Sequence, residues 1–333
     1  MQWIHDLLTR YPHLTDIHIT EGFPAYIREH GFMTRLTDNA ASWITDLENT
    51  LTDAKKKECQ SRGACDSALF AGDRRCRLHF YRTGGKKAAA LRILPSIEYL
   101  PGDPDQTWMT YISNLQTGLA LITGPTGSGK STTLAHILHQ INHCRPCHIL
   151  TIEEPVEYVF PSQCALIHQK EVGTDVHSFS EGMRDALRED PDIIVIGEMR
   201  DTATISAALT AAETGHLVLA TMHNKSAADA ALRIIHAFPG EKEQEIRSIF
   251  ASVLRTIGAQ KLYPIHGKLK LMREILTNTP AISHLIREGK DSQLTAYMEM
   301  GNHYMRTMKQ EADRIAREEQ LTYDEAEHIK YMM

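Results

Sequence analysis

The sequence has no long hydrophobic run and few aromatic residues, and its charges of the two signs nearly balance. Its longest apolar runs, at 119–122 and 193–196, are far shorter than the ~20 residues that a membrane-spanning helix needs. Asp6 and Arg10 interrupt the amphipathic start of the chain before the apolar core of a signal peptide could form. These absences predict a cytoplasmic protein.

The six cysteines lack the framework of a small disulfide-stabilised secreted domain, so free thiols are expected. Cys144 and Cys147 form a lone CxxC pair, and no second pair stands at the spacing of a zinc ribbon. A net charge of −6 with 7% aromatic residues gives no nucleic-acid-binding signature. The local exception is a basic cluster within 73–92, which has a single acid, Asp73, and seven basic residues: Arg74, Arg75, Arg77, Arg82, Lys86, Lys87 and Arg92.

The length of 333 residues, with 42% hydrophobic and 23% charged residues, is typical of a soluble protein of two domains. Residues 95–105, PSIEYLPGDPD, resist both helix and central strand and predict a linker. Before the linker, polar and apolar residues alternate in short segments that predict strands of an α+β domain. These segments are 15–20, 25–31, 76–82 and 88–94, with a helical stretch near 42–61.

After the linker, short apolar runs alternate with helical stretches, which predicts a parallel sheet with helices on both faces. The expected strands are 118–123, 148–152, 192–197 and 216–221, and the expected helices are 131–142, 178–189 and 202–213. From residue 241 onward, caps and amphipathic spacing predict a mainly helical region.

A glycine-rich segment between the first of these strands and the first helix carries a specific motif. Residues 124–131, GPTGSGKS, match G-x-x-x-x-G-K-[ST] in the strand–loop–helix context that a P-loop requires. Its backbone N–H groups can turn toward a polyphosphate, Lys130 can reach the β- and γ-phosphates, and Ser131 can hold Mg²⁺. The residues expected to bind a nucleoside triphosphate are Gly124, Pro125, Thr126, Gly127, Ser128, Gly129, Lys130, Ser131 and Thr132.

Charged side chains stand at the ends of the other expected strands. Glu153 and Glu154 end one strand, Glu198 follows another, and His223 lies just past a third. In parallel sheets ligands bind at the carboxyl ends of the strands, so these groups are expected to surround the same triphosphate. The usual metal-binding Asp is replaced by Gly197. Glu198 must therefore do the acid work, and the spacing leaves open whether it or Glu153 orients the attacking water.

Four segments together resemble the Walker A, Asp box, Walker B and His box motifs of the type II/IV secretion ATPases, in particular the PilT-type pilus retraction ATPases. They are GPTGSGKST, TIEEPVEY, ALREDPDIIVIGEMRD and AAETGHLVLATMHN, with further similarity in TDIHITEGFPAYIREHG, CRLHFYRTGGKKAAALRILPS and AISHLIREGK. The resemblance implies a hexameric ATP hydrolase that drives pilus disassembly. It also implies a platform protein and other pilus machinery as partners, and peripheral association with the inner membrane through them. It also implies an α/β fold, divided into a PAS-like α+β domain (1–96), a linker (97–106), a RecA-like P-loop domain (107–280) and a helical C-terminal tail (281–333).

The resemblance also assigns roles by motif position. It makes Glu153 the catalytic glutamate, Glu198 the Walker B glutamate and His223 a catalytic histidine, with ATP and Mg²⁺ as cofactors. It adds His216 to the nucleotide site and makes Ser131, Glu154 and Glu198 the expected metal ligands. Arg77 and Arg92 match arginines of the family's N-terminal domain and are expected to act in trans on a neighbouring subunit's nucleotide.

This sequence departs from the family pattern at several positions. Glu154 stands in place of an Asp, Asn224 in place of a Thr, and Ser283-His284 in place of Arg-Asn, and no GGGR segment is present. A conjugative or effector-secretion motor remains an alternative function. A RecA-like nucleic-acid translocase is a second alternative, disfavoured by the low aromatic content and the acidic core.

Overall fold

The computed structural model describes residues 1–29, 31–36, 40, 42–71, 74–95, 97–301 and 304–331. The chain divides into two compact units. The smaller contains Met1–Tyr99 with Glu157–Val159, and the larger contains Leu100–Val156 with Phe160–Met333. The predicted boundary at residue 96 and the last two residues lie outside the described residues. The four-part division of the chain stays a prediction.

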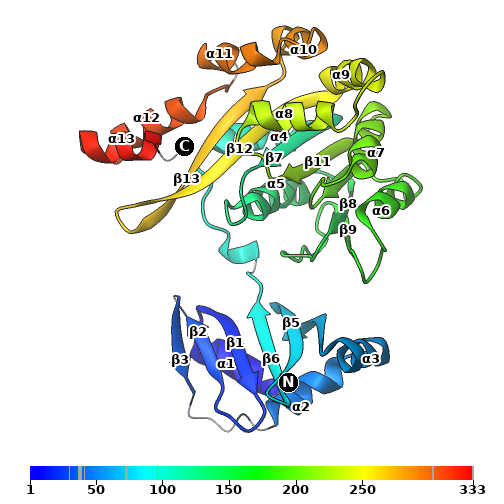
Figure 1. Ribbon diagram of the computed structural model, residues 1–333, viewed down its shortest axis with the longest axis vertical. Coiled ribbons are helices and arrows are strands. Elements are labelled where there is room, and N and C mark those ends of the chain that lie inside the picture. Colours follow the sequence, from blue (N-terminus) through cyan, green and yellow to red (C-terminus); the bar gives the residue numbers. More distant parts are fainter. Residues whose placement is uncertain are drawn as a thin grey trace. The chain divides into compact units, whose positions relative to one another are not determined.

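The smaller unit is a six-stranded antiparallel sheet, in the order β3-β2-β1-β6-β5-β4, packed against helices (Figure 1). Exposure alternates along β5 and β6, as the polar–apolar alternation predicts. On the helical side of the core, Trp3 stacks on Trp43 with ring centroids 4.4 Å apart. The elements are α1 Gln2–Arg10, β1 Leu14–Thr20, β2 Tyr26–Glu29, β3 Phe32–Arg35, α2 Trp43–Thr50, α3 Asp53–Arg62, β4 Ala64–Ala71, β5 Arg74–Thr83 and β6 Lys86–Ile93.

The larger unit is built on a seven-stranded sheet in the order β13-β12-β7-β11-β10-β8-β9, in which only the β12–β13 pair is antiparallel. Every residue of β7, β10 and β11 is buried, so both faces of the central strands are covered, as predicted. The strands are β7 Gly118–Thr123, β8 His148–Glu153, β9 Leu166–Glu171, β10 Ile193–Ile196, β11 Leu217–Met222, β12 Leu254–Ile265 and β13 Lys268–Thr277.

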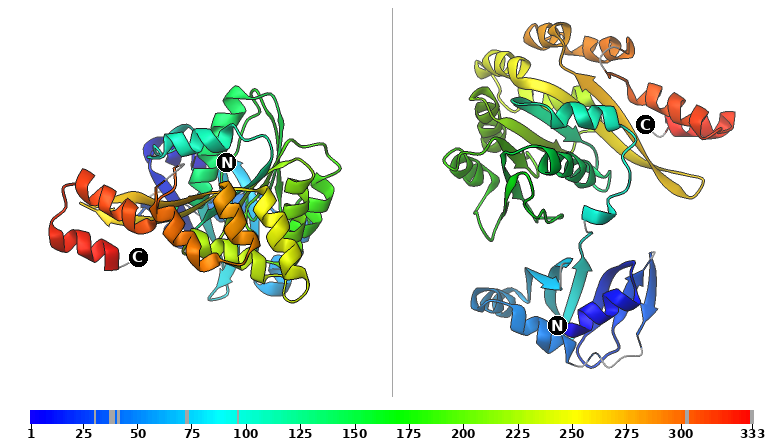
Figure 2. Two further views of the ribbon diagram at one scale, coloured as in Figure 1. Left: turned by 90° about the horizontal axis from the view of Figure 1, so that it is seen from above. Right: turned by 180° about the vertical axis from the view of Figure 1, so that it is seen from behind.

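The helices of the larger unit lie on and around this sheet (Figure 2). Helices α4 and α5 pack against each other, and α9 packs against α7, α8 and α10. None of the described helices has the length and apolarity that a membrane crossing requires. The bounds are η1 Ile97–Tyr99, α4 Gln106–Ser113, α5 Lys130–Cys144, α6 Phe179–Ala186, α7 Thr202–Glu213, α8 Ala227–His236, α9 Lys242–Val253, α10 Pro280–Arg287, η2 Asp291–Gln293, α11 Leu294–Glu299, α12 Met308–Glu318 and α13 Tyr323–Tyr331.

The prediction of a mainly helical region after residue 241 is wrong for 254–277, which form the long β12–β13 hairpin. Its two-residue turn, His266-Gly267, has positive φ at both positions (49° and 74°), the conformation of a type I′ turn. At Gly258, a Cβ would lie 2.5 Å from the Trp108 ring, so the strand passes the indole without a side chain. Pairing with β7 and the turn chemistry outweigh the helical spacing that continues from α9.

Candidate active site

The P-loop connects the end of β7 to the start of α5, in the strand–loop–helix context predicted for it. Gly124 has φ 148°, and a Cβ there would lie 2.2 Å from the carbonyl oxygen of Gln260. Gly127 and Gly129 take φ values of 77° and 86°, which favour glycine. The loop therefore depends on glycine at these three positions, and it ends at the N-terminus of α5, where unpaired N–H groups favour an anion.

Lys130, the first residue of α5, folds back over the loop. Its Nζ donates to the carbonyl oxygens of Gly124 (2.8 Å) and Pro125 (3.0 Å). Ser128 Oγ is buried and has no hydrogen-bond partner among the described residues. A backbone cradle closed by a lysine, with an unused hydroxyl inside it, fits the phosphates of a nucleotide.

A chain of polar contacts joins the P-loop to the ends of β10 and β11. Lys130 Nζ lies 3.4 Å from His223 Nδ1, and His223 Nε2 lies 3.1 Å from Glu198 Oε1. Lysine can only donate, so His223 accepts at Nδ1 and donates from Nε2 to the Glu198 carboxylate. Arg200 Nη2 contacts the other oxygen of Glu198 at 2.7 Å. Burial alone would raise the pKa of Glu198, but the hydrogen bonds from Arg200 and His223 hold it below its ordinary value.

Glu153 ends β8, next to β10 in the sheet. Its Oε1 accepts hydrogen bonds from Thr151 Oγ1 (2.7 Å) and Gln169 Nε2 (3.1 Å). Glu154 is exposed and accepts from Arg200 Nη1 at 3.2 Å. At Gly197, a Cβ would lie 3.2 Å from the Cα of Glu153. That contact is tight, so a side chain at 197 would crowd the backbone of Glu153, which gives a physical reason for glycine where an Asp is usual.

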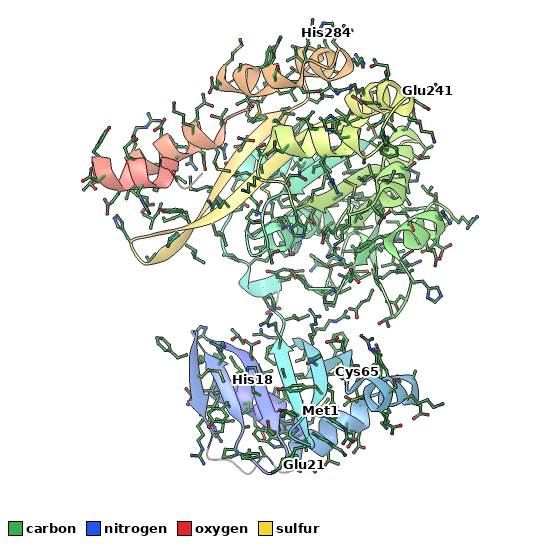
Figure 3. All side chains as sticks on the ribbon, viewed as in Figure 1. Met1, His18, Glu21, Cys65, Glu241 and His284 are labelled. Carbon is green, nitrogen blue, oxygen red and sulfur yellow. The ribbon has the colours of Figure 1, made fainter. Side chains whose placement is uncertain are left out.

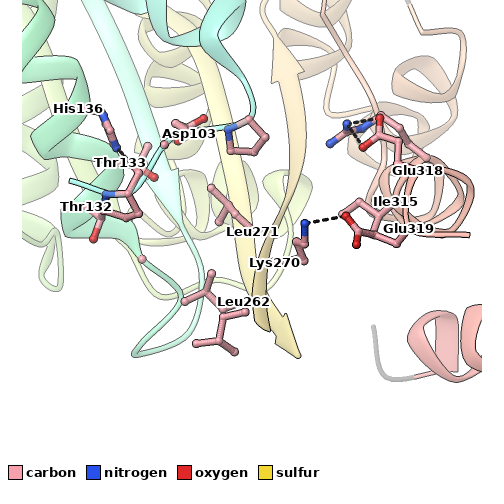
Figure 4. A pocket seen from close by; sticks show the side chains of 16 residues that line it. Asp103, Thr132, Thr133, His136, Leu262, Lys270, Leu271, Ile315, Glu318 and Glu319 are labelled. Atoms are coloured by element: carbon pink, nitrogen blue, oxygen red, sulfur yellow. Dashed lines mark hydrogen bonds and ion pairs between the residues drawn. The ribbon is translucent and has the colours of Figure 1, made fainter. Parts of the chain in front are cut away.

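A cavity of about 520 Å³ opens beside the P-loop (Figure 4). Gly129 and Thr132 line it on the P-loop side, and Leu262 and Leu271 of the hairpin line it with apolar surface. Asp103 and Pro104, just before α4, also line it. Its largely apolar wall next to a phosphate cradle is suited to a flat aromatic base.

Residues 94–328 match the family model described as type II/IV secretion system protein. The chain belongs to the type II/IV secretion system protein family.

Individual members of this family resemble the chain over most of its length. The type IV pilus retraction ATPase PilT of Pseudomonas aeruginosa is 39% identical over 297 residues, which cover 86% of this chain and 85% of PilT. An Escherichia coli protein, YggR, is 41% identical over 295 residues, which cover 86% of this chain and 89% of YggR. The crystal structure of the pilus retraction motor PilT with bound ADP superposes with a TM-score of 0.86 at 36% identity, covering 98% of this chain and 95% of that one. The expected resemblance and the α/β fold class with a RecA-like core are confirmed.

Not every predicted residue of this family member lies at the P-loop. His216 precedes β11, and its carbonyl oxygen accepts from the N–H of Gly118, the first residue of β7. The P-loop follows the other end of β7, so His216 lies at the opposite edge of the sheet. Its ring Nδ1 lies 3.0 Å from the Ala211 carbonyl oxygen, at the end of α7. His216 was assigned to the nucleotide site by the resemblance alone, and that assignment stays a prediction. Arg77 and Arg92 belong to the smaller unit.

Two of the residues that depart from the family pattern have defined contacts. Asn224 contacts the site through its backbone, since its carbonyl oxygen accepts from Thr123 Oγ1 (2.9 Å) and its N–H donates back to that oxygen (2.8 Å). The Asn224 side chain instead bonds the carbonyl oxygen of Asp229. Ser283 is buried, and its hydroxyl donates to the carbonyl oxygen of Ala251 at 2.8 Å.

Gln260 of β12 is part of the site, although no sequence motif predicts it. Its side-chain amide donates to the carbonyl oxygen of Ser128 within the P-loop. Gln260 lies in the segment that was expected to be helical, where no motif marks it. A strand prediction for 254–265 would have placed Gln260 beside β7. Strand patterning was the only available signal for it.

Proposed function

We propose that this chain is the ATP-hydrolysing subunit of a hexameric motor that retracts type IV pili. The observation that carries the proposal is the polar chain from Lys130 through His223 to Glu198 at the P-loop edge of the sheet. Similarity to the ADP-bound pilus retraction motor over 98% of the chain supports the same function.

The loop from Gly124 to Thr132 holds the phosphates of ATP, and Lys130 exchanges its loop carbonyls for phosphate oxygens. The cavity lined by Leu262 and Leu271 takes the base. Ser131 would supply a hydroxyl ligand for Mg²⁺, and Glu198 and Glu154 would supply carboxylate ligands. When bound, Mg²⁺ neutralises negative charge on the phosphates as the terminal phosphoryl group leaves.

Glu153 and Glu198 take different roles because their surroundings differ. Glu198 contacts a cation on one oxygen and an imidazole N–H on the other, and its lowered pKa makes it a weak base. Glu198 holds the positively charged Arg200 near the phosphates. Glu153, fixed by Thr151 and Gln169, orients the attacking water.

Three variants of the full chain test this assignment by ATP turnover and nucleotide binding. Lys130→Ala should abolish productive ATP binding, while Glu153→Gln should keep binding and lose turnover, because only the charge that orients water is removed. Glu198→Gln should weaken binding of Mg²⁺-ATP more than binding of metal-free ADP. Near-normal turnover in Glu153→Gln would contradict its role and transfer it to Glu198.

The proposal extends to the wider assembly. Six copies form a ring in the cytoplasm, held at the inner membrane by the pilus platform protein, and the smaller unit of one copy supplies Arg77 and Arg92 to the neighbour's nucleotide. Native mass spectrometry with ATP should show a hexamer. Cells that lack the protein should be piliated and unable to retract. If they retract normally but fail to secrete a substrate, the chain is instead a secretion motor.

A further inference from the structure

Gln260 is a buried amide, 1% exposed, that contacts both ends of the P-loop from the neighbouring strand β12. Its Nε2 donates to the carbonyl oxygen of Ser128 at 2.8 Å, and its Oε1 accepts from Thr133 Oγ1 at 3.0 Å. At the start of the loop, its backbone oxygen occupies the space where a Cβ of Gly124 would lie, only 2.2 Å away. Gln260 therefore excludes a side chain at Gly124, the first residue of the loop, and holds the backbone at Ser128 near its end.

The direction of the Gln260 amide is fixed by its neighbours. Arg273, which is fully buried, donates from Nη2 to Thr133 Oγ1 at 2.9 Å and lies 3.4 Å from Gln260 Oε1. A guanidinium can only donate, so the Thr133 hydroxyl accepts from Arg273 and donates its own hydrogen to Gln260 Oε1. The NH₂ of Gln260 is then left facing the carbonyl oxygen of Ser128, which can only accept. A flipped amide would oppose donor to donor and acceptor to acceptor.

Arg273 is itself held by acidic partners from the segment before α4. It donates to both carboxylate oxygens of Asp103, at 2.9 and 2.8 Å, and to Asp105 at 2.8 Å. Its guanidinium also lies 4.8 Å from the centre of the Trp108 ring. A buried arginine with two carboxylates and an aromatic face has little freedom to turn, so the Thr133–Gln260 pair has a rigid support.

The Ser128–Gly129 peptide is trans, because the one cis bond of the described chain is Glu154-Pro155. In a planar trans peptide, the C=O and the N–H point in opposite directions. When Gln260 holds the Ser128 oxygen toward β12, it turns the Gly129 N–H away from β12. This N–H stands at the start of α5, where the unpaired amides of the helix already favour an anion.

We infer that Gln260 is a positioning residue for the nucleotide, which aims the Gly129 N–H at the terminal phosphate of a bound diphosphate. The inference rests on the proposed function, since it needs a nucleotide at the P-loop. Gln260 touches no phosphate itself and acts through the Ser128–Gly129 peptide.

Two substitutions at 260 separate positioning from packing. Gln260→Met keeps the volume and removes all three side-chain hydrogen bonds. Gln260→Glu, measured at pH 8, keeps the acceptor for Thr133 and Arg273 and removes the donor to Ser128. Affinities of the full chain for ADP and AMP are measured by competition with a fluorescent ADP. Both variants should lose about tenfold in ADP affinity, the loss expected for one hydrogen bond to a charged group. AMP reaches less of the loop, so the ratio of ADP to AMP affinity should fall in both.

Thr256→Val is the matched control on the same strand. Thr256 is fully buried and makes two hydrogen bonds, accepting from Trp108 Nε1 and donating to the Leu276 carbonyl oxygen, so its loss should lower the melting temperature comparably without changing the ADP-to-AMP ratio. An unchanged ratio in both Gln260 variants, or a loss in Gln260→Met with wild-type affinity in Gln260→Glu, would overturn the inference. Failure of the wild-type chain to bind ADP would instead refute the proposed function.

Discussion

Arg77 of β5 and Arg92 of β6 occupy directly opposed positions on neighbouring antiparallel strands. Arg92 is itself opposite Asp16 of β1, and its Nε bonds the Asp16 carboxylate at 2.8 Å. The Arg77 side chain is exposed and makes no hydrogen bond or ion pair with any residue that the structure describes. Like charges on opposed positions destabilise a sheet, and one acid offsets only one of them. The smaller unit thus keeps an uncompensated arginine on its surface.

The first prediction follows from this pair. Arg77→Ala should leave the stability of the isolated chain unchanged or raise it by up to ~1 kcal/mol, because a like-charge contact is removed. ATP turnover of the ring should nevertheless fall about a thousandfold if Arg77 acts on the phosphates bound by a neighbouring subunit. Mixing Arg77→Ala with Lys130→Ala subunits should restore some turnover, since one mixed interface combines an intact arginine with an intact P-loop. Wild-type turnover in rings made only of Arg77→Ala would refute trans action.

The second prediction concerns His223, which bridges Lys130 and Glu198. His223→Ala should keep ADP binding within a few-fold and lower ATP turnover about a hundredfold, because both partners lose the contact that fixes their positions. His216→Ala is the control from the other end of β11 and should leave both quantities near wild type. Equal losses of ATP turnover in the two variants would show that a histidine need not lie at the P-loop edge of the sheet to contribute to turnover.

The site was predictable to the extent that its residues follow from a local motif or from a strand end. The P-loop, Glu153, Glu198 and His223 come together because parallel strands present their carboxyl ends at one edge. The tight approach of Gly197 to Glu153 and the Gln260 contact with Ser128 join residues far apart in sequence, and no local pattern encodes them. Tertiary pairing, rather than propensity, placed them.

The fold beyond the site shows the same limit. Within 118–221, β7, β8, β10 and β11 were predicted well because their apolar runs are short, complete and separated by helices. The edge strand β9 was not predicted. The segment 95–105 was expected to be a linker, yet Asp103 is buried and bonded to Arg273, some 170 positions further along. Its prolines and acidic residues indicate little regular structure, but they do not identify Arg273 as the partner of Asp103.

The third prediction uses this buried ion pair. Burial would raise the pKa of Asp103, but hydrogen bonds and charge from Arg273 outweigh burial and lower it. A lowered folded-state pKa contributes stability above the unfolded pKa of about 4, and the contribution is lost as pH falls through the folded value. Asp103→Asn should therefore cost about 3–5 kcal/mol in unfolding free energy at pH 7 and progressively less below pH 4.

A surface ion pair provides the control for that measurement. Asp185 and Arg188 are 3.6 Å apart, with side chains 55% and 79% exposed. Asp185→Asn should change stability little at any pH, because exposed pairs contribute about 0–1 kcal/mol. A pH-independent loss in Asp103→Asn would mean that shape, rather than charge, makes Asp103 necessary.

The final prediction concerns α10, the helix within AISHLIREGK. The helix starts with Pro280 in its first turn, and the Thr279 side chain accepts from the N–H of Ile282. Gly289 follows its end with φ 67°. Ile282 and Ile286 are fully buried, and Leu285 is only partly buried at the edge of the core. His284, at the surface of α10 (Figure 3), is exposed.

Arg287 and Glu288 are also exposed, and the contacts that the structure gives them are made by their backbones. The Arg287 carbonyl oxygen accepts from Gln244 Nε2, and the Glu288 N–H donates to the His284 carbonyl oxygen. Ile286→Ala should thus lower the unfolding free energy by about 2–5 kcal/mol, as for a buried aliphatic side chain. The double change Arg287→Ala/Glu288→Ala should leave folding and basal ATP turnover nearly intact, because neither side chain packs in the core, and should stop pilus retraction in cells. Melting curves, turnover and a twitching assay on the same variants separate packing from coupling. Normal twitching in the double variant would leave α10 with a packing role alone.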